Sequence, residues 1–233
     1  MSYPVDAPTP VALASDDVRA AFMVKVYQHL ALAVGAFLVF EIMLFMSGAA
    51  EALLNFIGAN TFGWISILGG VMVANMIATT AASRMDSVGS QYGGLFLLAF
   101  AEAVIFAPFL YMVFNSDGGT ATVQTAAVIT ILGFGALSVV GFTTKKDLSF
   151  LRPLVMWGGI VAMGLIVLGL LGILQLGVFF SVAMIGLAGA AILYQTQTIL
   201  RQYPEWAYVS AAIGLFASLM TMFWYVLRLL SRR

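Results

Sequence analysis

Long apolar runs separated by short polar connections make up most of this 233-residue chain. A helix that crosses a bilayer needs about 20 consecutive apolar residues. Seven runs reach that length, and they lie at 22–47, 61–82, 91–114, 121–143, 150–174, 177–200 and 207–230. The pattern predicts an all-α integral membrane protein, a single seven-transmembrane-helix bundle over residues 21–233. Connections such as "NSDGGT" and "RQYPEW" leave no room for a second domain, and the polar residues 1–20 are expected to form a flexible tail.

Composition supports the membrane assignment and narrows the chemistry. The chain is 62% hydrophobic and only 9% charged, whereas soluble domains have about 25% charged residues. The lipid bilayer is therefore the first expected partner. The formal net charge is zero, which gives no argument for nucleic acid as a partner. Cysteine is absent and His29 is the single histidine, so disulfides, thiolate or multi-histidine metal sites and most catalytic triads are excluded.

An enzyme is the weakest of the functional interpretations. Intramembrane serine proteases need a histidine base, and His29 stands far from any glycine-flanked serine. The paired membrane aspartates of aspartyl proteases are missing. A retinal protein needs a lysine in its last helix, and none is present there. No cofactor is expected.

The basic residues predict the orientation, because short cytoplasmic loops carry an excess of Lys and Arg. With the N-terminus inside and the C-terminus outside, seven of the ten basic residues lie on the cytoplasmic side: Arg19, Lys25, Arg84, Lys145, Lys146, Arg152 and Arg201. The basic C-terminus, with Arg228, Arg232 and Arg233, argues against this orientation, but fewer charges support the reverse.

Two acidic residues lie inside predicted spans, where a charge costs about 2.5–3.5 kcal/mol even on mild insertion scales. Glu102 lies near the middle of the third span, and a functional acid and a neutral structural acid are both open interpretations. Glu41 lies nearer the end of the first span and is expected to reach the interface. Neither acid has a basic residue at helical spacing, so each must pair across the bundle, meet water or carry a proton.

The stretch "ILYQTQTIL" places four uncharged polar residues, 195–198, in the sixth span. Gln195 and Thr198 share one helix face, while Gln197 points elsewhere. In the seventh span Ser218 and Thr221 also share a face. These positions predict a polar seam between the last two helices, in which neutral groups join helices by hydrogen bonds worth about 0.6 kcal/mol each.

Three segments carry a family resemblance. "TKKDLSFLRPLV" at 144–155, "AAILYQTQTIL" at 190–200 and "GLFASLMTMFWYVLRLL" at 214–230 resemble the Bax inhibitor-1 family. The start of the first span and Pro108 in the third are similar to that family too, so the resemblance covers nearly all of the chain after residue 20. It implies a seven-helix fold.

The resemblance also implies two different functions. Some bacterial members act as pH-sensitive calcium leak channels, whereas a YccA-like branch regulates a membrane-anchored AAA protease. In the channel members two aspartates share a proton and close the pore; here their positions fall on Gln195 and Ser218. Neither group titrates, so the proton switch is missing. Arg84 lies near the position of a family arginine.

The missing carboxylates favour a regulatory or accessory protein of the bacterial inner membrane that binds a membrane protease or another membrane complex. The alternative is a cation leak channel, for calcium ions among others, with a modified gate. The residues that would line its path are Gln195, Ser218 and Glu102, with Arg84 as a further candidate. Which ion passes, the partner's identity and the oligomeric state stay open at this point.

Overall fold

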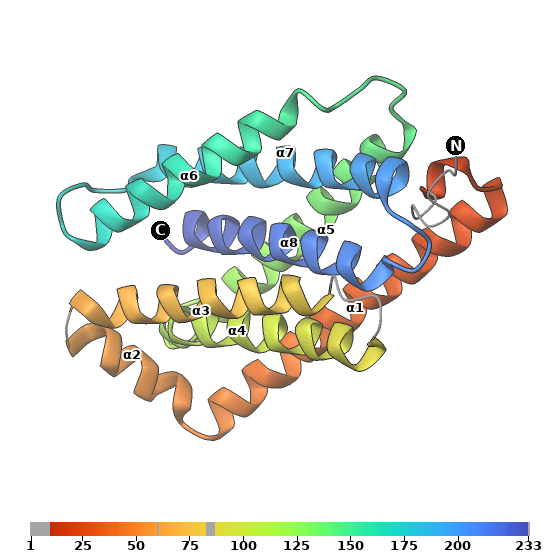
Figure 1. Cartoon of the computed structure of the whole chain (residues 1–233). Coiled ribbons are helices and arrows are strands. Elements are labelled where there is room, and N and C mark those ends of the chain that lie inside the picture. The colour runs from red at the N-terminus through yellow and green to blue at the C-terminus, as the bar shows by residue number, and fades with distance from the viewer. Residues whose placement is uncertain (1–9, 60, 83–86, 233) are drawn as a thin grey trace.

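The structure is a computed structural model that describes residues 10–59, 61–82 and 87–232. In this part of the chain every regular element is a helix (Figure 1). The elements are η1 (Val11–Leu13), α1 (Asp16–Met46), α2 (Ala49–Ala59), α3 (Thr61–Ala82), α4 (Val88–Phe114), α5 (Gly119–Thr143), α6 (Leu151–Leu170), α7 (Val178–Gln202) and α8 (Tyr208–Leu230). All of the α-helices except α2 are long and apolar enough to cross a membrane, which gives seven candidate spans. The predicted seven-transmembrane all-α bundle is confirmed.

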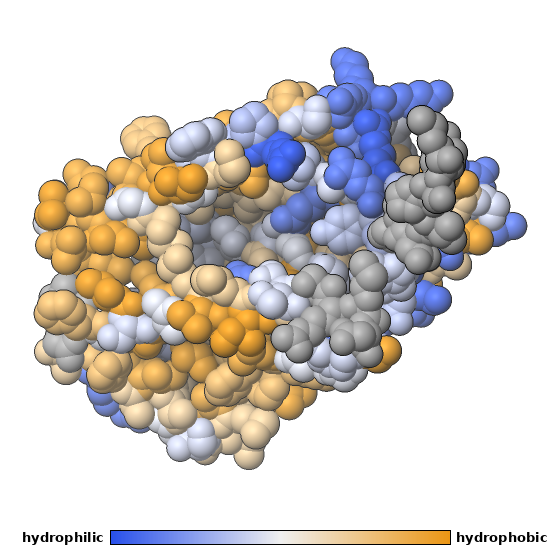
Figure 2. All heavy atoms as spheres, viewed as in Figure 1, coloured by the Kyte–Doolittle hydropathy of each residue, from blue (hydrophilic) through white to orange (hydrophobic). Residues whose placement is uncertain are grey.

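Successive long helices run up and down, so their connections collect at two ends of the bundle. The basic end, at which α1 begins, holds the α5–α6 and α7–α8 connections together with Arg19, Lys25, Lys145, Lys146, Arg152 and Arg201. It lies on the right in Figure 1, and α8 finishes at the opposite end on the left. Most of the hydrophilic surface gathers at the basic end, and a mainly apolar surface covers the rest of the visible face (Figure 2).

Helix α8 forms the centre of the bundle, and α6 lies at its edge. In the most apolar 18-residue stretch of α8, 61% of the residues are buried inside the protein, whereas the corresponding share in α6 is 6%. Helix α8 packs against α7, α1, α5, α4 and α3, whereas α6 leans mainly on α7. Any polar group on α8 is therefore enclosed by other helices and needs a partner there.

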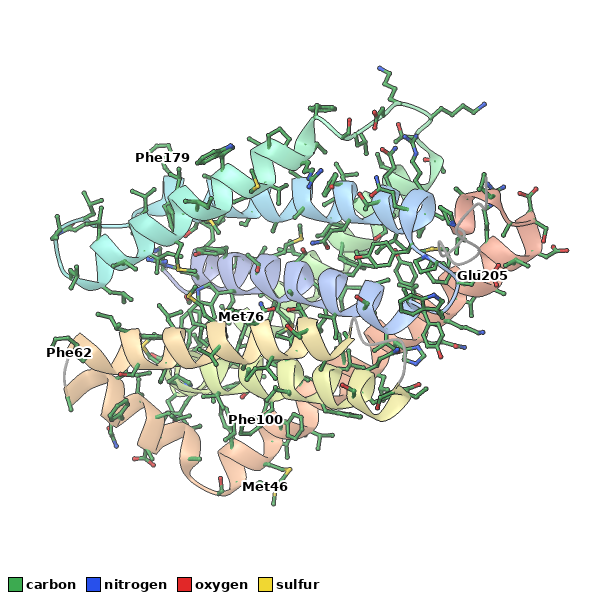
Figure 3. All side chains as sticks on the ribbon, in the orientation of Figure 1. Met46, Phe62, Met76, Phe100, Phe179 and Glu205 are labelled. Carbon is green, nitrogen blue, oxygen red and sulfur yellow. The ribbon has the colours of Figure 1, made fainter. Side chains whose placement is uncertain are left out.

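Large apolar side chains cover the outside of the bundle. Phe179 is 91% exposed, Met46 is 85% exposed and Phe62 is 74% exposed. All three point away from the neighbouring helices (Figure 3). Such a surface suits lipid rather than water, because a soluble protein rarely exposes a continuous apolar patch of this extent. The seven spans and this apolar exterior place the protein in a lipid bilayer.

Two stretches differ from the expectation. The connection between the first two spans contains α2, a helix of 11 residues that is too short to cross a bilayer. Gly48, with φ of 76°, makes the turn that separates α2 from α1, because this backbone conformation strains residues with a Cβ. The predicted tail also differs: η1 and the first turns of α1 lie within residues 10–20.

The segment before α1 is attached to the connection between α7 and α8. The Val11 N–H donates to the Tyr203 carbonyl over 2.8 Å, and Pro10 pairs with Pro204 in an isolated bridge. Val11 is fully buried. This apolar side chain, in an otherwise polar stretch, fastens the start of the described chain to the α7–α8 connection.

Candidate functional site

The polar run near the end of α7 sends its side chains to three different places. Gln195 faces α8, Thr196 faces α1 and α5, and Gln197 reaches the α5–α6 connection. Successive helical residues are rotated by about 100°, so three neighbours contact three parts of the bundle. The run therefore joins α7 to most of its surroundings at the basic end.

Gln195 and Ser218 form what we call the neutral lock. The Ser218 hydroxyl donates to Gln195 Oε1 over 3.1 Å, and Ser218 is only 7% exposed. Gly214, one turn earlier on α8, faces the Gln195 amide, whose nearest atoms would lie at an ordinary contact distance of 3.8 Å from a Cβ at that position. The two side chains that the sequence places in a seam are thus in direct contact. Neither an amide nor a hydroxyl ionises in the range of pH that a protein survives.

Gln197 holds the α5–α6 connection through what we call the loop clasp. The Leu148 N–H donates to Gln197 Oε1 over 2.7 Å, and Gln197 Nε2 donates to the Lys146 carbonyl over 2.7 Å. One amide thereby satisfies both a backbone donor and a backbone acceptor in a connection without regular structure. Sequence reasoning missed this role, since the partners are main-chain groups whose position depends on the fold of the connection.

Asp147 organises the same connection from within. Its carboxylate accepts hydrogen bonds from the Ser149 N–H over 3.0 Å and the Ser149 hydroxyl over 2.9 Å. These bonds, with a smaller contribution from the Arg201 guanidinium, hold the pKa of Asp147 below its ordinary value of 3.8. The contact therefore stabilises the connection above pH of about 4 and is lost as the pH falls through the lower folded-state pKa.

Thr196 belongs to a cluster of buried hydroxyl groups. Thr196 is fully buried and Ser138 on α5 is 3% exposed, and both lie beside the Tyr27 hydroxyl on α1. Within the described residues none of the three oxygens has a direct hydrogen-bond partner of good geometry. Gly141 allows α5 to approach here, because a Cβ at that position would lie 2.9 Å from the Thr196 side chain.

A cavity of about 550 Å³ lies between α3, α4, α6, α7 and α8, and we call it the central cavity. Figure 2 shows the molecule hollowed between the α6–α7 layer and α3. Its walls are mainly apolar, and four of its polar lining residues are Glu102, Asn75, Thr221 and Arg228. Leu174 and Leu176 line it at the end opposite the basic end, whereas Glu102 lies midway along α4.

Glu102 is half-buried in this cavity. Among the described residues it forms no ion pair or hydrogen bond. Arg228 lines the same cavity, but its guanidinium donates to the Leu176 carbonyl over 3.3 Å. Thr221 also lines the cavity, and Ser218 lies one turn before it on α8, nearer the basic end. The neutral lock therefore lies next to the inner end of the cavity.

This geometry can be compared with known proteins. A family model described as inhibitor of apoptosis-promoting Bax1 matches residues 19–233. The chain belongs to the Bax inhibitor-1 family. An uncharacterized protein of Pseudomonas aeruginosa is 33% identical over 119 residues, which are 50% of this chain and 52% of that protein. The match therefore spans about half the length of this relative.

As a member of the Bax inhibitor-1 family, the chain keeps the expected contact between the last two helices with uncharged groups. The role of Gln195 and Ser218 as a gate stays a prediction, and so does a pore-lining role for Glu102. Arg84 lies outside the described residues. In the described part of the chain, no three acidic or histidine side chains gather into a group that could hold a metal ion.

Glu41 corrects one expectation for this family member. It does not reach the interface: its side chain is 6% exposed, and neither carboxyl oxygen has a partner within the described residues. Helix α2, which was not predicted, packs on both α1 and α4 at this end of the bundle. The position of Glu41 near the end of the first span predicted an exposed side chain. Helix α2, however, folds back and adds protein at the level where the membrane–water interface was expected.

His29 has the structural role that its position near a membrane surface suggests. Its Nε2 lies 2.7 Å from the Tyr92 hydroxyl and its Nδ1 lies 2.7 Å from the Lys25 carbonyl. The ring also packs on Tyr208, with ring centroids 4.8 Å apart. These contacts join α1, α4 and α8 at the basic end and leave no ring nitrogen for a ligand.

Proposed function

We propose that this protein is a non-enzymatic, multi-pass protein of the bacterial inner membrane that provides a cation leak path with a gate that does not titrate. The observation that carries the proposal is the unpaired Glu102 carboxyl inside the central cavity. Acidic side chains at this depth are costly, and they usually line a path for ions or water. Glu41 also lacks a partner among the described residues, but only Glu102 lines the central cavity.

The neutral lock is the proposed gate. It joins α7 to α8 just before Met220 and Thr221, the first residues of α8 that line the central cavity. A cation that reached Glu102 would have to pass between these helices to continue toward the basic end. Breaking one hydrogen bond costs about 0.6 kcal/mol on average between transmembrane helices. The lock is thus weak enough for thermal opening and independent of pH.

The proposed ion is one that the site binds weakly. Calcium prefers 6–8 oxygen ligands, whereas the polar wall near Glu102 adds mainly Asn75 and Thr221. Conduction requires binding that is strong enough for entry and weak enough for release. A single carboxylate with two neutral oxygens meets that requirement for calcium and for monovalent cations.

The proposed orientation has the basic end in the cytoplasm. Six of the eight basic residues in the described part of the chain belong to that end, which fits the excess of Lys and Arg in short cytoplasmic loops. The N-terminus is then inside and the C-terminus outside, and the end of the central cavity that Leu174 and Leu176 line lies toward the outer face. Outside cations would meet that end first.

The leak predicts a clear effect of Glu102→Gln. A cation about 4 Å from a carboxylate gains about 1–4 kcal/mol, and each 1.4 kcal/mol changes a rate about tenfold. Replacing the carboxylate by an amide of the same shape is expected to lower cation flux about tenfold. The measurement is calcium and potassium flux into liposomes that contain the purified protein, with ion-sensitive dyes.

The matched control is Glu205→Gln, which removes an exposed carboxylate at the basic end. Its flux should equal that of the wild type. Wild-type flux equal to that of empty liposomes would contradict the leak, and so would an unchanged flux in Glu102→Gln.

A second function, binding of a membrane-anchored AAA protease or another membrane complex, is favoured by the outer face of α6. Trp157 is 61% exposed and Val161 is 58% exposed on this loosely packed helix. A Cβ at Gly164, which shares a helix face with these two residues, would meet no atom within 4 Å. A small residue on an open helix face allows a partner helix to approach closely.

This second function predicts a partner that is lost when the face is blocked. In Gly164→Leu, a protease that co-purifies in mild detergent should be lost, as detected by mass spectrometry. Gly135→Leu is the control, since it adds bulk at an equally open position on α5. Isolation of the wild type without any partner would contradict this function.

A further inference from the structure

A second cavity, of about 430 Å³, lies at the basic end, and we call it the headgroup cavity. Its charged lining consists of Arg19 from α1 and Arg201 from α7, and no acidic residue lines it among the described residues. It belongs neither to the central cavity nor to the neutral lock. Its volume lies within the range of about 300–1,000 Å³ that is usual for small-molecule sites.

Both guanidinium groups are available to a ligand. The side chain of Arg201 is 43% exposed and that of Arg19 is 42% exposed. Arg201 contacts Asp147 Oδ1 and the Lys145 carbonyl, each over 3.5 Å, which is the limit for a hydrogen bond. Arg19 pairs with Asp16 at an exposed position, where an ion pair contributes little. An anion between the two arginines would gain shorter, charge-assisted bonds.

The remaining lining indicates more than a free anion. Met23, Phe142 and Leu200 add apolar wall to the headgroup cavity. Leu13, in η1 beside the lining residue Ala12, is 76% exposed. A free phosphate ion would gain nothing from contact with this apolar wall, whereas the glycerol and first acyl carbons of a lipid would pack against it.

The depth of the cavity matches the headgroup layer. Arg201 lies one residue before the end of α7, and Thr144 directly follows α5. Arg19 lies in the first turn of α1, a helix of 31 residues and so about 46 Å long, against a hydrocarbon core of about 30 Å. The arginines therefore lie where the apolar spans end, at the level of lipid phosphates.

We propose that the headgroup cavity binds the phosphate of an anionic phospholipid between Arg19 and Arg201. The acyl chains leave along the exposed apolar surface. Because Arg19 belongs to α1 and Arg201 belongs to α7, a bound lipid bridges the ends of these two helices. The site does not depend on cation flux.

Native mass spectrometry of the full chain in mild detergent tests the site with two lipids, phosphatidylglycerol and zwitterionic phosphatidylcholine. The wild type is expected to retain phosphatidylglycerol in preference to phosphatidylcholine. In Arg19→Gln/Arg201→Gln the affinity for phosphatidylglycerol should fall about thirtyfold, the effect of two basic contacts of usual strength at an anionic lipid surface. Arg19→Lys/Arg201→Lys keeps both charges and should retain most of the binding.

The matched control is Lys146→Gln/Arg152→Gln, which removes two charges from the same end but outside the cavity. An equal loss in this control would overturn the proposal, because surface charge alone would then explain binding. Equal retention of the two lipids by the wild type would also overturn it. Inorganic phosphate that displaces the lipid at millimolar concentration would overturn the lipid assignment in favour of a free anion.

Discussion

Gln195→Asp/Ser218→Asp is expected to convert a pH-independent cation flux into one that rises with pH. Two carboxyls at the distance of the present 3.1 Å hydrogen bond can share one proton, and they titrate as a coupled pair. While the proton is present, the pair keeps α7 and α8 together. After its loss, two like charges face each other in a low-dielectric environment and repel.

The measurement is flux into liposomes over a series of pH values, with the wild type beside the double variant. Gln195→Asp and Ser218→Asp alone serve as controls, because a single carboxyl still faces a neutral partner and lacks the repulsion. A double variant whose flux stays flat with pH would contradict the assignment of these positions to the gate. A wild type that already responds to pH would contradict a neutral lock.

Gln197→Leu is expected to destabilise the protein strongly. The substitution removes both hydrogen bonds of the loop clasp, to the Leu148 N–H and the Lys146 carbonyl. The connection is partly exposed to water, so each bond contributes about 0.5–1.5 kcal/mol and the free energy of unfolding should fall by about 1–3 kcal/mol. Thermal unfolding in detergent measures the loss, and amide hydrogen exchange localises it.

The exchange should accelerate mainly between residues 145 and 149, which the clasp holds. Thr198→Val, one residue further along α7, is the control, since Thr198 is a half-buried polar neighbour that is no part of the clasp. It should leave stability and exchange unchanged. If Gln197→Leu unfolds at the wild-type temperature with wild-type exchange, the clasp has no role in stability.

Most of the fold was predictable because each long apolar run becomes one helix. The expected span at 121–143 matches α5 closely, and 207–230 matches α8. Helix α2 was not predictable by the same rule, since its 11 residues are too few for a span. Turn geometry at Gly48 decides that the chain folds back there, and a hydropathy pattern does not report backbone angles.

The candidate site was predictable in part. Helical spacing and the family resemblance together brought Gln195 and Ser218 to one seam, and the structure places them in contact. The partners of Gln197 were not predictable, because an amide that binds main-chain groups leaves no matching side chain to find. The prediction that Glu41 reaches the interface was wrong for a related reason. The position of a residue along a helix predicts its exposure only when no other segment covers that part of the helix.

The bond from Val11 to Tyr203 has a consequence for how the protein is made. The Val11 N–H finds its acceptor 192 residues later in the chain, so the earliest described segment waits until nearly all of the polypeptide has left the ribosome. During that interval the first span must sit in the membrane with its leading segment unfastened. The segment before α1 is therefore held in place only after the α7–α8 connection has been synthesised.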